Sequence, residues 1–86
     1  MKWQVYILQC SDQSLYTGIT TDIRRRLKEH NAKKGAKAIK GKLPVRLVYQ
    51  ENHSSRSKAQ VREAEIKSWS RTQKLVFLKK SLILKG

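Results

Sequence analysis

The sequence predicts an α+β fold with two strands, a helix, a third strand and two further helices, in the order β-β-α-β-α-α. Residues 3–10 are rich in β-forming side chains on two alternating faces, and a helical pattern begins at Ile23. A chain of 86 residues with no internal repeat and no long linker has room for one core. Residues 1–86 are therefore expected to form a single domain.

The first two elements are expected to form a hairpin. A strand over residues 3–10 leads through a polar turn at 11–14 into a second strand over residues 15–19. On the first strand, one face is expected to carry Trp3, Val5, Ile7 and Gln9 and the other Gln4, Tyr6, Leu8 and Cys10.

The register of this hairpin decides whether its two tyrosines can meet. A regular hairpin across a four-residue turn pairs Cys10 with Leu15 and places Tyr6 and Tyr16 on opposite faces. A shared site therefore requires a bulge or a shifted register. Gly18 is the expected place for a bulge or a close backbone approach.

The first helix is expected over residues 23–31. Ile23 and Leu27 lie four residues apart on one of its faces, and three N-cap candidates precede it, namely Thr20, Thr21 and Asp22.

The second half of the chain begins with a segment, residues 32–44, that is expected to be a mobile basic loop with a short turn at 36–39. A third strand is expected at 45–50 and helices at about 58–69 and 71–80. Two strings with capping-box spacing predict the helix starts, Ser57-x-x-Gln60 and Ser70-x-x-Gln73. The apolar tripeptide at 82–84 is expected to pack back on the core or to form a contact surface.

Charge makes a polyanion the expected partner. The chain has 20 Lys and Arg against 6 Asp and Glu, a formal net charge of +14, and residues 23–47 hold ten of the basic side chains and one Glu. A solubilising surface usually has a net charge of only about 2 to 8. No apolar stretch approaches the roughly 18 residues of a membrane span. The chain start does not resemble a secretory signal, and the single Cys10 cannot form an internal disulfide, so a cytoplasmic location is expected.

The sequence offers candidates for metal-assisted phosphodiester cleavage, whereas it shows no zinc-binding spacing, phosphate loop or catalytic triad. At about 100° per residue, Glu63 falls on the apolar face of its helix near Ala59 and Ile66, and Glu65 points away. A carboxylate on an apolar face needs a partner or a metal. A single carboxylate suits Mg²⁺, although Glu63 paired with an Arg or Lys is the simpler alternative.

The first helix offers a cation and a titratable ring. Arg26 and His30 lie four residues apart on one face, where both can approach one phosphate. Arg24 and Arg25 are expected to contact a nucleic-acid backbone. The alternatives are a solvated charge run for the arginines and a helix C-terminal charge partner for His30.

Tyr6 and Tyr16 have both a structural and a catalytic interpretation. Either can be an ordinary strand aromatic. As functional groups they would orient or deprotonate the attacking water, which requires a nearby cation or metal because the ordinary pKa of tyrosine is about 10. Arg26 is the expected cation.

The order and spacing of short strings along nearly the whole chain resemble the GIY-YIG nucleases, and most closely the small stand-alone GIY-YIG proteins of bacteria, an uncharacterised family. The resemblance implies a three-stranded antiparallel sheet flanked by helices. It also implies a cleavage site of Tyr6, Tyr16, Arg26, His30 and Glu63, with Mg²⁺ or Mn²⁺ on Glu63. The strings that carry it include Val5-Tyr6-Ile7-Leu8, Tyr16-Thr17-Gly18-Ile19, Arg25-Arg26-Leu27, Glu29-His30-Asn31, Gly35-Ala36-Lys37 and Arg62-Glu63.

Two functions follow as hypotheses. The first is a Mg²⁺-dependent GIY-YIG endonuclease that acts on DNA, including branched or damaged DNA in repair or recombination. The second is a non-catalytic module that binds DNA or structured RNA. Because GIY-YIG enzymes generally carry a specificity domain, a protein partner is also expected. Nucleic-acid contacts are expected from Arg24, Arg25, Lys33, Lys34, Lys37, Lys40 and Lys42.

Overall fold

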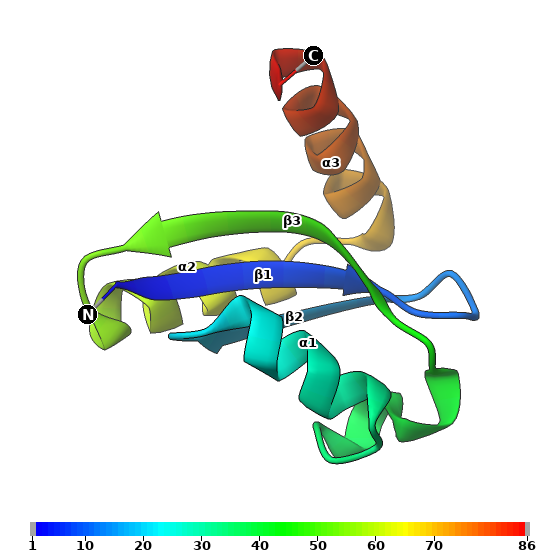
Figure 1. Cartoon of the computed structure of the whole chain (residues 1–86). Helices are drawn as coiled ribbons and strands as arrows, with labels where there is room; N and C mark the ends of the chain where they lie inside the picture. Colours follow the sequence, from blue (N-terminus) through cyan, green and yellow to red (C-terminus); the bar gives the residue numbers. More distant parts are fainter. Residues whose placement is uncertain (1, 86) are drawn as a thin grey trace.

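Three antiparallel strands form the centre of the structure, a computed structural model that describes residues 2–85, with the side chains of 82–85 outside the description. β1 (Trp3–Gln9) lies between β2 (Leu15–Thr20) and β3 (Arg46–His53), so the strand order is β2-β1-β3. The antiparallel sheet and the order β-β-α-β-α-α are confirmed (Figure 1).

The β1–β2 hairpin has the shifted register that a shared tyrosine site requires. Gln9 pairs with Leu15, so five residues rather than four connect the strands, and Tyr6 lies opposite Gly18. Gln13 adopts a positive φ of 73°, and the Asp12 carboxylate accepts hydrogen bonds from the backbone and hydroxyl of Ser14. The expected pairing of Cys10 with Leu15 is wrong because this turn takes in one more residue. Both tyrosines consequently share a face.

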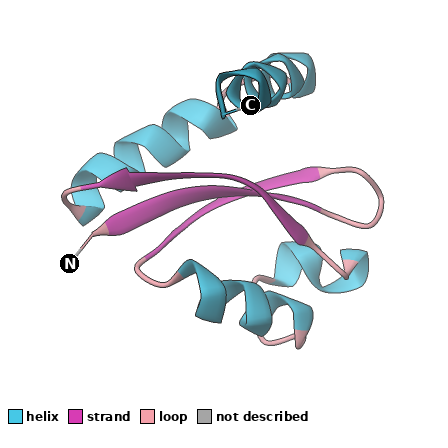
Figure 2. Ribbon diagram, turned by 45° about the horizontal axis from the view of Figure 1, so that its top comes forward, coloured by secondary structure: helices cyan, strands magenta, loops and turns pink. Residues whose placement is uncertain are grey.

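Helices lie on both sides of the sheet (Figure 2), and each face of the sheet carries its own hydrophobic core. Tyr6 and Leu8 pack with Ile39 and Val45 beneath the helix that follows β2, while Val5 and Ile7 pack on the other face with two residues of the helix that follows β3. The alternation expected for the first strand is therefore confirmed. The second core is completed by Ala59 and Ile66, which are fully buried.

α1 (Ile23–Asn31) has the expected bounds, and Asp22 is its N-cap, accepting a hydrogen bond from the Arg25 amide at 3.1 Å. The segment after it differs from a simple loop. It forms a 3₁₀ helix, η1 (Lys37–Lys42), that is attached to the core by Ile39, which is 3% exposed. The expected mobile loop is wrong because one apolar residue among the lysines and alanines of this segment, Ile39, is enough to attach it to the core.

The end of α1 is tied to the start of β3 by the Asn31 amide. Its Nδ2 donates to the Val45 carbonyl at 3.1 Å, and its Oδ1 accepts from the Val45 amide at 2.8 Å. This pair of bonds imitates the pairing of two strands and closes the loop that contains η1. β3 continues to His53, three residues beyond the expected end at Gln50, and an irregularity in its pairing with β1 falls between Ile7 and Leu8.

α2 (Arg56–Lys67) and α3 (Arg71–Lys85) cover the face opposite α1 (Figure 2). The expected capping box at Ser70 is confirmed by its reciprocal hydrogen bonds with Gln73. For α2 the expected cap is wrong, because Ser55 accepts from the Lys58 amide and starts the helix two residues earlier. The backbone of 82–84 continues α3, and the expected packing of those side chains lies outside the described residues.

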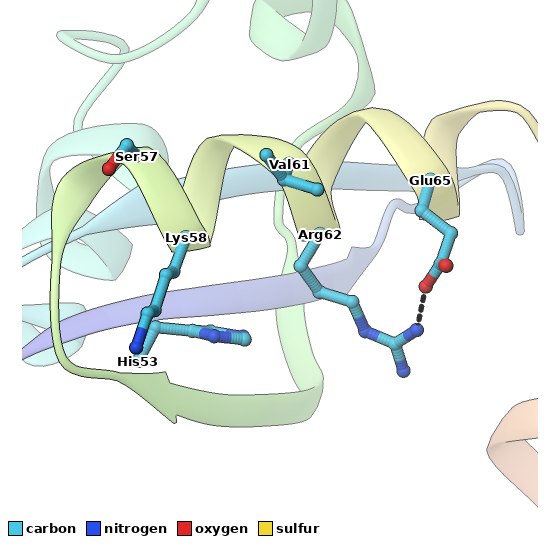
Figure 3. A pocket seen from close by; sticks show the side chains of 6 residues that line it. All are labelled: His53, Ser57, Lys58, Val61, Arg62 and Glu65. Atoms are coloured by element: carbon cyan, nitrogen blue, oxygen red, sulfur yellow. Dashed lines mark hydrogen bonds and ion pairs between the residues drawn. The ribbon is translucent and has the colours of Figure 1, made fainter.

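A carboxylate at the centre of a polar network joins β3 to α2. Glu51 accepts hydrogen bonds from Tyr49 Oη at 2.7 Å, from His53 Nε2 at 2.5 Å and from Arg62 Nε at 3.1 and 3.2 Å. The Arg62 guanidinium also bonds Glu65 (Figure 3) and lies 5.3 Å from the ring centre of Trp69. Burial and the Glu51 carboxylate raise the pKa of Tyr49 to about 12. These partners explain why the polar end of β3 is ordered.

We predict that Glu51→Gln lowers the free energy of unfolding by about 1 to 2 kcal/mol, because Arg62 and His53 lose a partly buried charged acceptor. Glu65→Gln is the matched control, since it faces the same arginine but is 54% exposed, and it should change stability by less than about 0.5 kcal/mol. Urea unfolding measures both. Equal losses in the two variants would contradict the central role of Glu51.

Candidate active site

Tyr6 lies deepest in the group of candidate residues. It projects from β1 on the α1 side of the sheet and is 1% exposed. Its ring crosses the backbone of Gly18 so closely that a Cβ at that position would lie 2.6 Å from Tyr6 Oη. The close backbone approach expected at Gly18 is therefore present, and it makes room for the tyrosine.

His30 is buried beside Tyr6 and is also 1% exposed. Its Nε2 lies 3.1 Å from Tyr6 Oη, and its Nδ1 accepts a hydrogen bond from the Ala36 amide at 3.3 Å. Burial lowers the pKa of His30 below its ordinary value, and the positive charge of Arg26 lowers it further. His30 is thus a neutral ring at neutral pH and does not serve as a charged helix-end partner.

Tyr16 forms the more exposed side of the same cluster. Its ring centre lies 6.4 Å from that of Tyr6 and 5.6 Å from that of His30, edge to face with the imidazole. Tyr16 is only partly buried, unlike the other two rings. Of the three rings, it is the one best placed to touch a ligand.

Arg26 is only partly buried, and its guanidinium lies next to the Tyr6 hydroxyl and 3.3 Å from the carboxylate of Glu29. Burial raises the pKa of Tyr6 above its ordinary value, and the Arg26 guanidinium offsets only part of that shift. Arg26 therefore does not by itself bring the pKa of Tyr6 below its ordinary value, and activation of a tyrosine by Arg26 or a metal stays a prediction. Tyr6 keeps its proton at neutral pH.

Glu63 extends from α2 and is close enough for its charge to contribute to the raised pKa of Tyr6. Its side chain is 21% exposed against 54% for Glu65, which agrees with the orientation expected from helix geometry. Glu63 also forms an ion pair with Lys67 at 3.2 Å, the simpler alternative considered for it. Because Lys67 is half-exposed and reaches Glu63 through a flexible side chain, this pair leaves the carboxylate open to exchange of partners.

The donor set fits a magnesium ion only in part. Among residues 2–85, no group of three or more His, Cys, Asp or Glu side chains is placed to hold a metal. Mg²⁺ needs no such cage, since it commonly takes one or two carboxylates and completes its shell with water and phosphate oxygen. Glu63 therefore fits a metal site that is assembled together with a phosphate-bearing ligand.

The expected nucleic-acid contacts gather on the layer formed by α1, η1 and the segment between them. Six of the seven are exposed, and Lys42 is partly buried and pairs with Asp12 at 3.7 Å. The same layer holds Arg26 and His30, so the basic surface and the cluster share one side of the sheet. The exposed residues are Arg24, Arg25, Lys33, Lys34, Lys37 and Lys40.

Two site residues were missed as functional positions in the sequence. Glu29 holds Arg26, and Gly35 allows the chain to pass over the His30 ring, where a Cβ would lie 2.1 Å from Nδ1. Both residues stand in strings that carry the family resemblance, but nothing in the sequence shows that Glu29 pairs with Arg26 or that Gly35 touches the imidazole.

A cavity of about 450 Å³ lies apart from this cluster, on the α2 side of the sheet (Figure 3). Arg62 and His53, two of its lining residues, are already bonded to Glu51. The other lining residues are Ser57, Lys58, Val61 and Glu65. None of the candidate catalytic residues lines it.

Among residues 2–85, no helix is long and apolar enough to cross a membrane.

Comparison with known proteins supplies the family. The profile of the GIY-YIG catalytic domain matches residues 2–76. A UPF0213 protein of Staphylococcus haemolyticus is 58% identical over 74 residues, covering 86% of this chain and 90% of its own. A UPF0213 protein of Haloquadratum walsbyi is 57% identical over 70 residues, or 81% and 79% of the two chains.

Two solution NMR structures have the same fold. That of a UPF0213 protein from Bacillus halodurans superposes with a TM-score of 0.58 at 44% identity, covering all of this chain and 87% of that one. That of an E. faecalis protein superposes with a TM-score of 0.65 at 38% identity, covering 96% and 88% of the two chains.

We predict that the His30 ring titrates below the ordinary histidine pKa of about 6.5, because burial and Arg26 disfavour its charged form. Folding favours the neutral ring, so this contribution to stability is complete above about pH 6.5 and is lost as the pH falls through the lower folded pKa. NMR titration of the ring and urea unfolding across this range measure both effects. Titration of His30 at or above the value of an unfolded peptide would contradict the assignment.

Proposed function

The chain belongs to the GIY-YIG catalytic-domain family, and from this membership we propose that it is a metal-dependent endonuclease that hydrolyses phosphodiester bonds in DNA, including branched or damaged DNA. The observation that carries the proposal is the convergence of Tyr6, Tyr16, Arg26 and His30 from three elements on the side of the sheet that bears the basic surface. Purely structural aromatics would not require a neighbouring arginine and a buried imidazole.

The proposed roles follow from how deeply each side chain is buried. Arg26, one third exposed, contacts the scissile phosphate and stabilises the charge that develops in the transition state. Tyr16, the more exposed tyrosine, orients the attacking water. Tyr6 and His30 are almost wholly buried. They therefore hold Arg26 and Tyr16 in place, and they exchange protons with the substrate only by way of these two more exposed residues.

Glu63 is the proposed ligand for Mg²⁺ or Mn²⁺, and the bound ion supplies Lewis-acid stabilisation of the phosphate. The contribution of the chain itself is a carboxylate held half-buried by α2, whose neighbours Ala59 and Ile66 are anchored in the core. This anchoring keeps Glu63 at a fixed place relative to β1.

A second candidate function is a nucleic-acid-binding module without catalysis. The ion pair between Glu63 and Lys67 favours it, since a carboxylate neutralised by lysine can be purely structural. The burial of Tyr6 favours it as well. The two functions share the basic surface and differ in whether Arg26 and Glu63 are needed for anything beyond binding.

We predict that the protein cleaves one or more members of a panel of single-stranded, duplex, flap and four-way DNA in the presence of Mg²⁺ or Mn²⁺. Arg26→Ala and Glu63→Gln should each reduce the single-turnover rate on the order of 100-fold or more, as loss of a charge-stabilising group does in other enzymes. Quenched time courses at saturating protein separate cleavage from binding.

Matched controls remove the same charges elsewhere. Glu65→Gln lies on the same helix as Glu63, and Arg71→Ala removes an exposed arginine of α3 on the opposite side of the sheet. Both should cleave at the wild-type rate. Binding of the panel with no cleavage by the wild type at any metal concentration would instead establish the binding module, and RNA would be the next ligand to examine.

A separate prediction concerns binding. Replacing Lys34 and Lys37 together with alanine should weaken DNA affinity and reduce the magnitude of the salt slope, d log K/d log [salt], by about 1.8 if both contact phosphate. Fluorescence anisotropy at several salt concentrations measures this slope. Lys79→Ala with Lys80→Ala on α3 is the control of equal charge. An unchanged slope in the variant that lacks Lys34 and Lys37 would show that DNA binds to another surface of the protein.

A further inference from the structure

We propose that Gly35 and Ala36 are positioning residues of the candidate active site, because the Ala36 amide fixes the tautomer of His30 and thereby makes Tyr6 Oη a hydrogen-bond acceptor. The proposal rests on the proposed nuclease function for its catalytic meaning. Its structural content concerns two hydrogen bonds that can be observed whether or not the protein cleaves DNA.

The first step is the identity of the proton on the imidazole. A backbone N–H can only donate, and the Ala36 amide lies 3.3 Å from His30 Nδ1. Nδ1 must therefore present a lone pair, since a proton there would bring two N–H groups face to face. The neutral ring then carries its single proton on Nε2.

The second step is the direction of the bond to tyrosine. With the proton on Nε2, His30 donates across 3.1 Å to Tyr6 Oη. The Arg26 guanidinium lies beside the same hydroxyl and offsets part of the rise in its pKa. Because the Nε2–H group meets the Tyr6 hydroxyl as a donor, the Tyr6 proton cannot pass to this imidazole.

The third step is why the chain can approach the ring at all. An ideal Cβ on Gly35 would lie 2.1 Å from Nδ1, 2.8 Å from Cγ and 2.9 Å from Cα of His30. No side chain fits there unless the imidazole or the backbone moves. Gly41, in the same basic segment, offers the opposite case, with nothing within 4 Å of its ideal Cβ.

These residues also link the basic surface to the buried ring. Gly35 and Ala36 lie between Lys34 and Lys37, which are exposed and proposed to bind phosphate. The segment is held at its far end by Ile39 in the core and by the clamp of Asn31 on Val45. A polyanion bound to these lysines would therefore contact the same short stretch of chain that fixes the tautomer of His30.

The deciding experiment is NMR on ¹⁵N-labelled wild-type protein. Long-range ¹H–¹⁵N correlation of the His30 ring at neutral pH should show an unprotonated Nδ1 and a protonated Nε2. A coupling across the hydrogen bond from the Ala36 amide to Nδ1 should also be detected. A protonated Nδ1 would overturn the proposal without bearing on whether the protein is a nuclease.

Three variants test whether the Ala36 amide, and not Tyr6, determines the tautomer of His30. Tyr6→Phe should keep the same His30 tautomer, because Ala36 and not Tyr6 determines it, whereas a change of tautomer in this variant would overturn the proposal. Gly35→Ala should lose the Ala36 to Nδ1 coupling and shift the ring signals, and Gly41→Ala should leave both unchanged.

Where the wild type cleaves DNA, Gly35→Ala should reduce the single-turnover rate on the order of 100-fold with little change in affinity, as displacement of a catalytic group by about 1 Å does. Gly41→Ala should cleave normally. A Gly35→Ala protein with its His30 signals displaced and its cleavage rate intact would overturn the positioning role, while a wild type that never cleaves rejects the nuclease function and leaves the tautomer assignment standing.

Discussion

The register of the β1–β2 hairpin is the constraint on which the candidate site depends. With Tyr6 opposite Gly18 and Leu8 opposite Tyr16, both tyrosines project from one face. A slip of one residue would move one of them to the α2 side. The glycine is part of the same constraint, because a Cβ there would occupy the space of the Tyr6 hydroxyl. The five-residue turn, with Gln13 at positive φ, sets the register that places both tyrosines on the same face of the sheet.

α1 and η1 complete what the hairpin begins. The Asp22 cap starts α1 so that Arg26 and His30 face the tyrosines one turn apart, and the Asn31 clamp returns the chain to β3. On the other face, Val5 and Ile7 anchor α2, which carries Glu63. β1 therefore holds both halves of the proposed site, because alternate residues of one strand organise the aromatic cluster and the helix that bears the carboxylate.

Periodicity and capping rules could predict most of the fold. The alternation of β1, the bounds of α1 and the capping box at Ser70 are local signals and are confirmed. Two failures are local, the length of the hairpin turn and the cap of α2, and the others concern residues satisfied by distant partners. Glu51 extends β3 because Arg62 of α2 balances its charge, and Ile39 orders η1 because it reaches the core. For the site, spacing separated Glu63 from Glu65 and paired Arg26 with His30, but it could not show that Gly35 touches the imidazole, since that contact exists only after α1 and η1 have packed.

Burial favours a division of labour within the aromatic cluster rather than four equivalent catalytic groups. A wholly buried Tyr6 with a raised pKa and a neutral His30 with a lowered one are both poor at exchanging protons with solvent. The same pair is well suited to hold an oxygen in a fixed place, because each ring is bonded at defined atoms and neither gains charge at neutral pH. Tyr16 and Arg26 lie outside them, where a phosphate can arrive. A buried, uncharged pair of rings below a partly exposed arginine is a preorganised arrangement, and in the proposed nuclease it would serve to stabilise charge that appears only in the transition state.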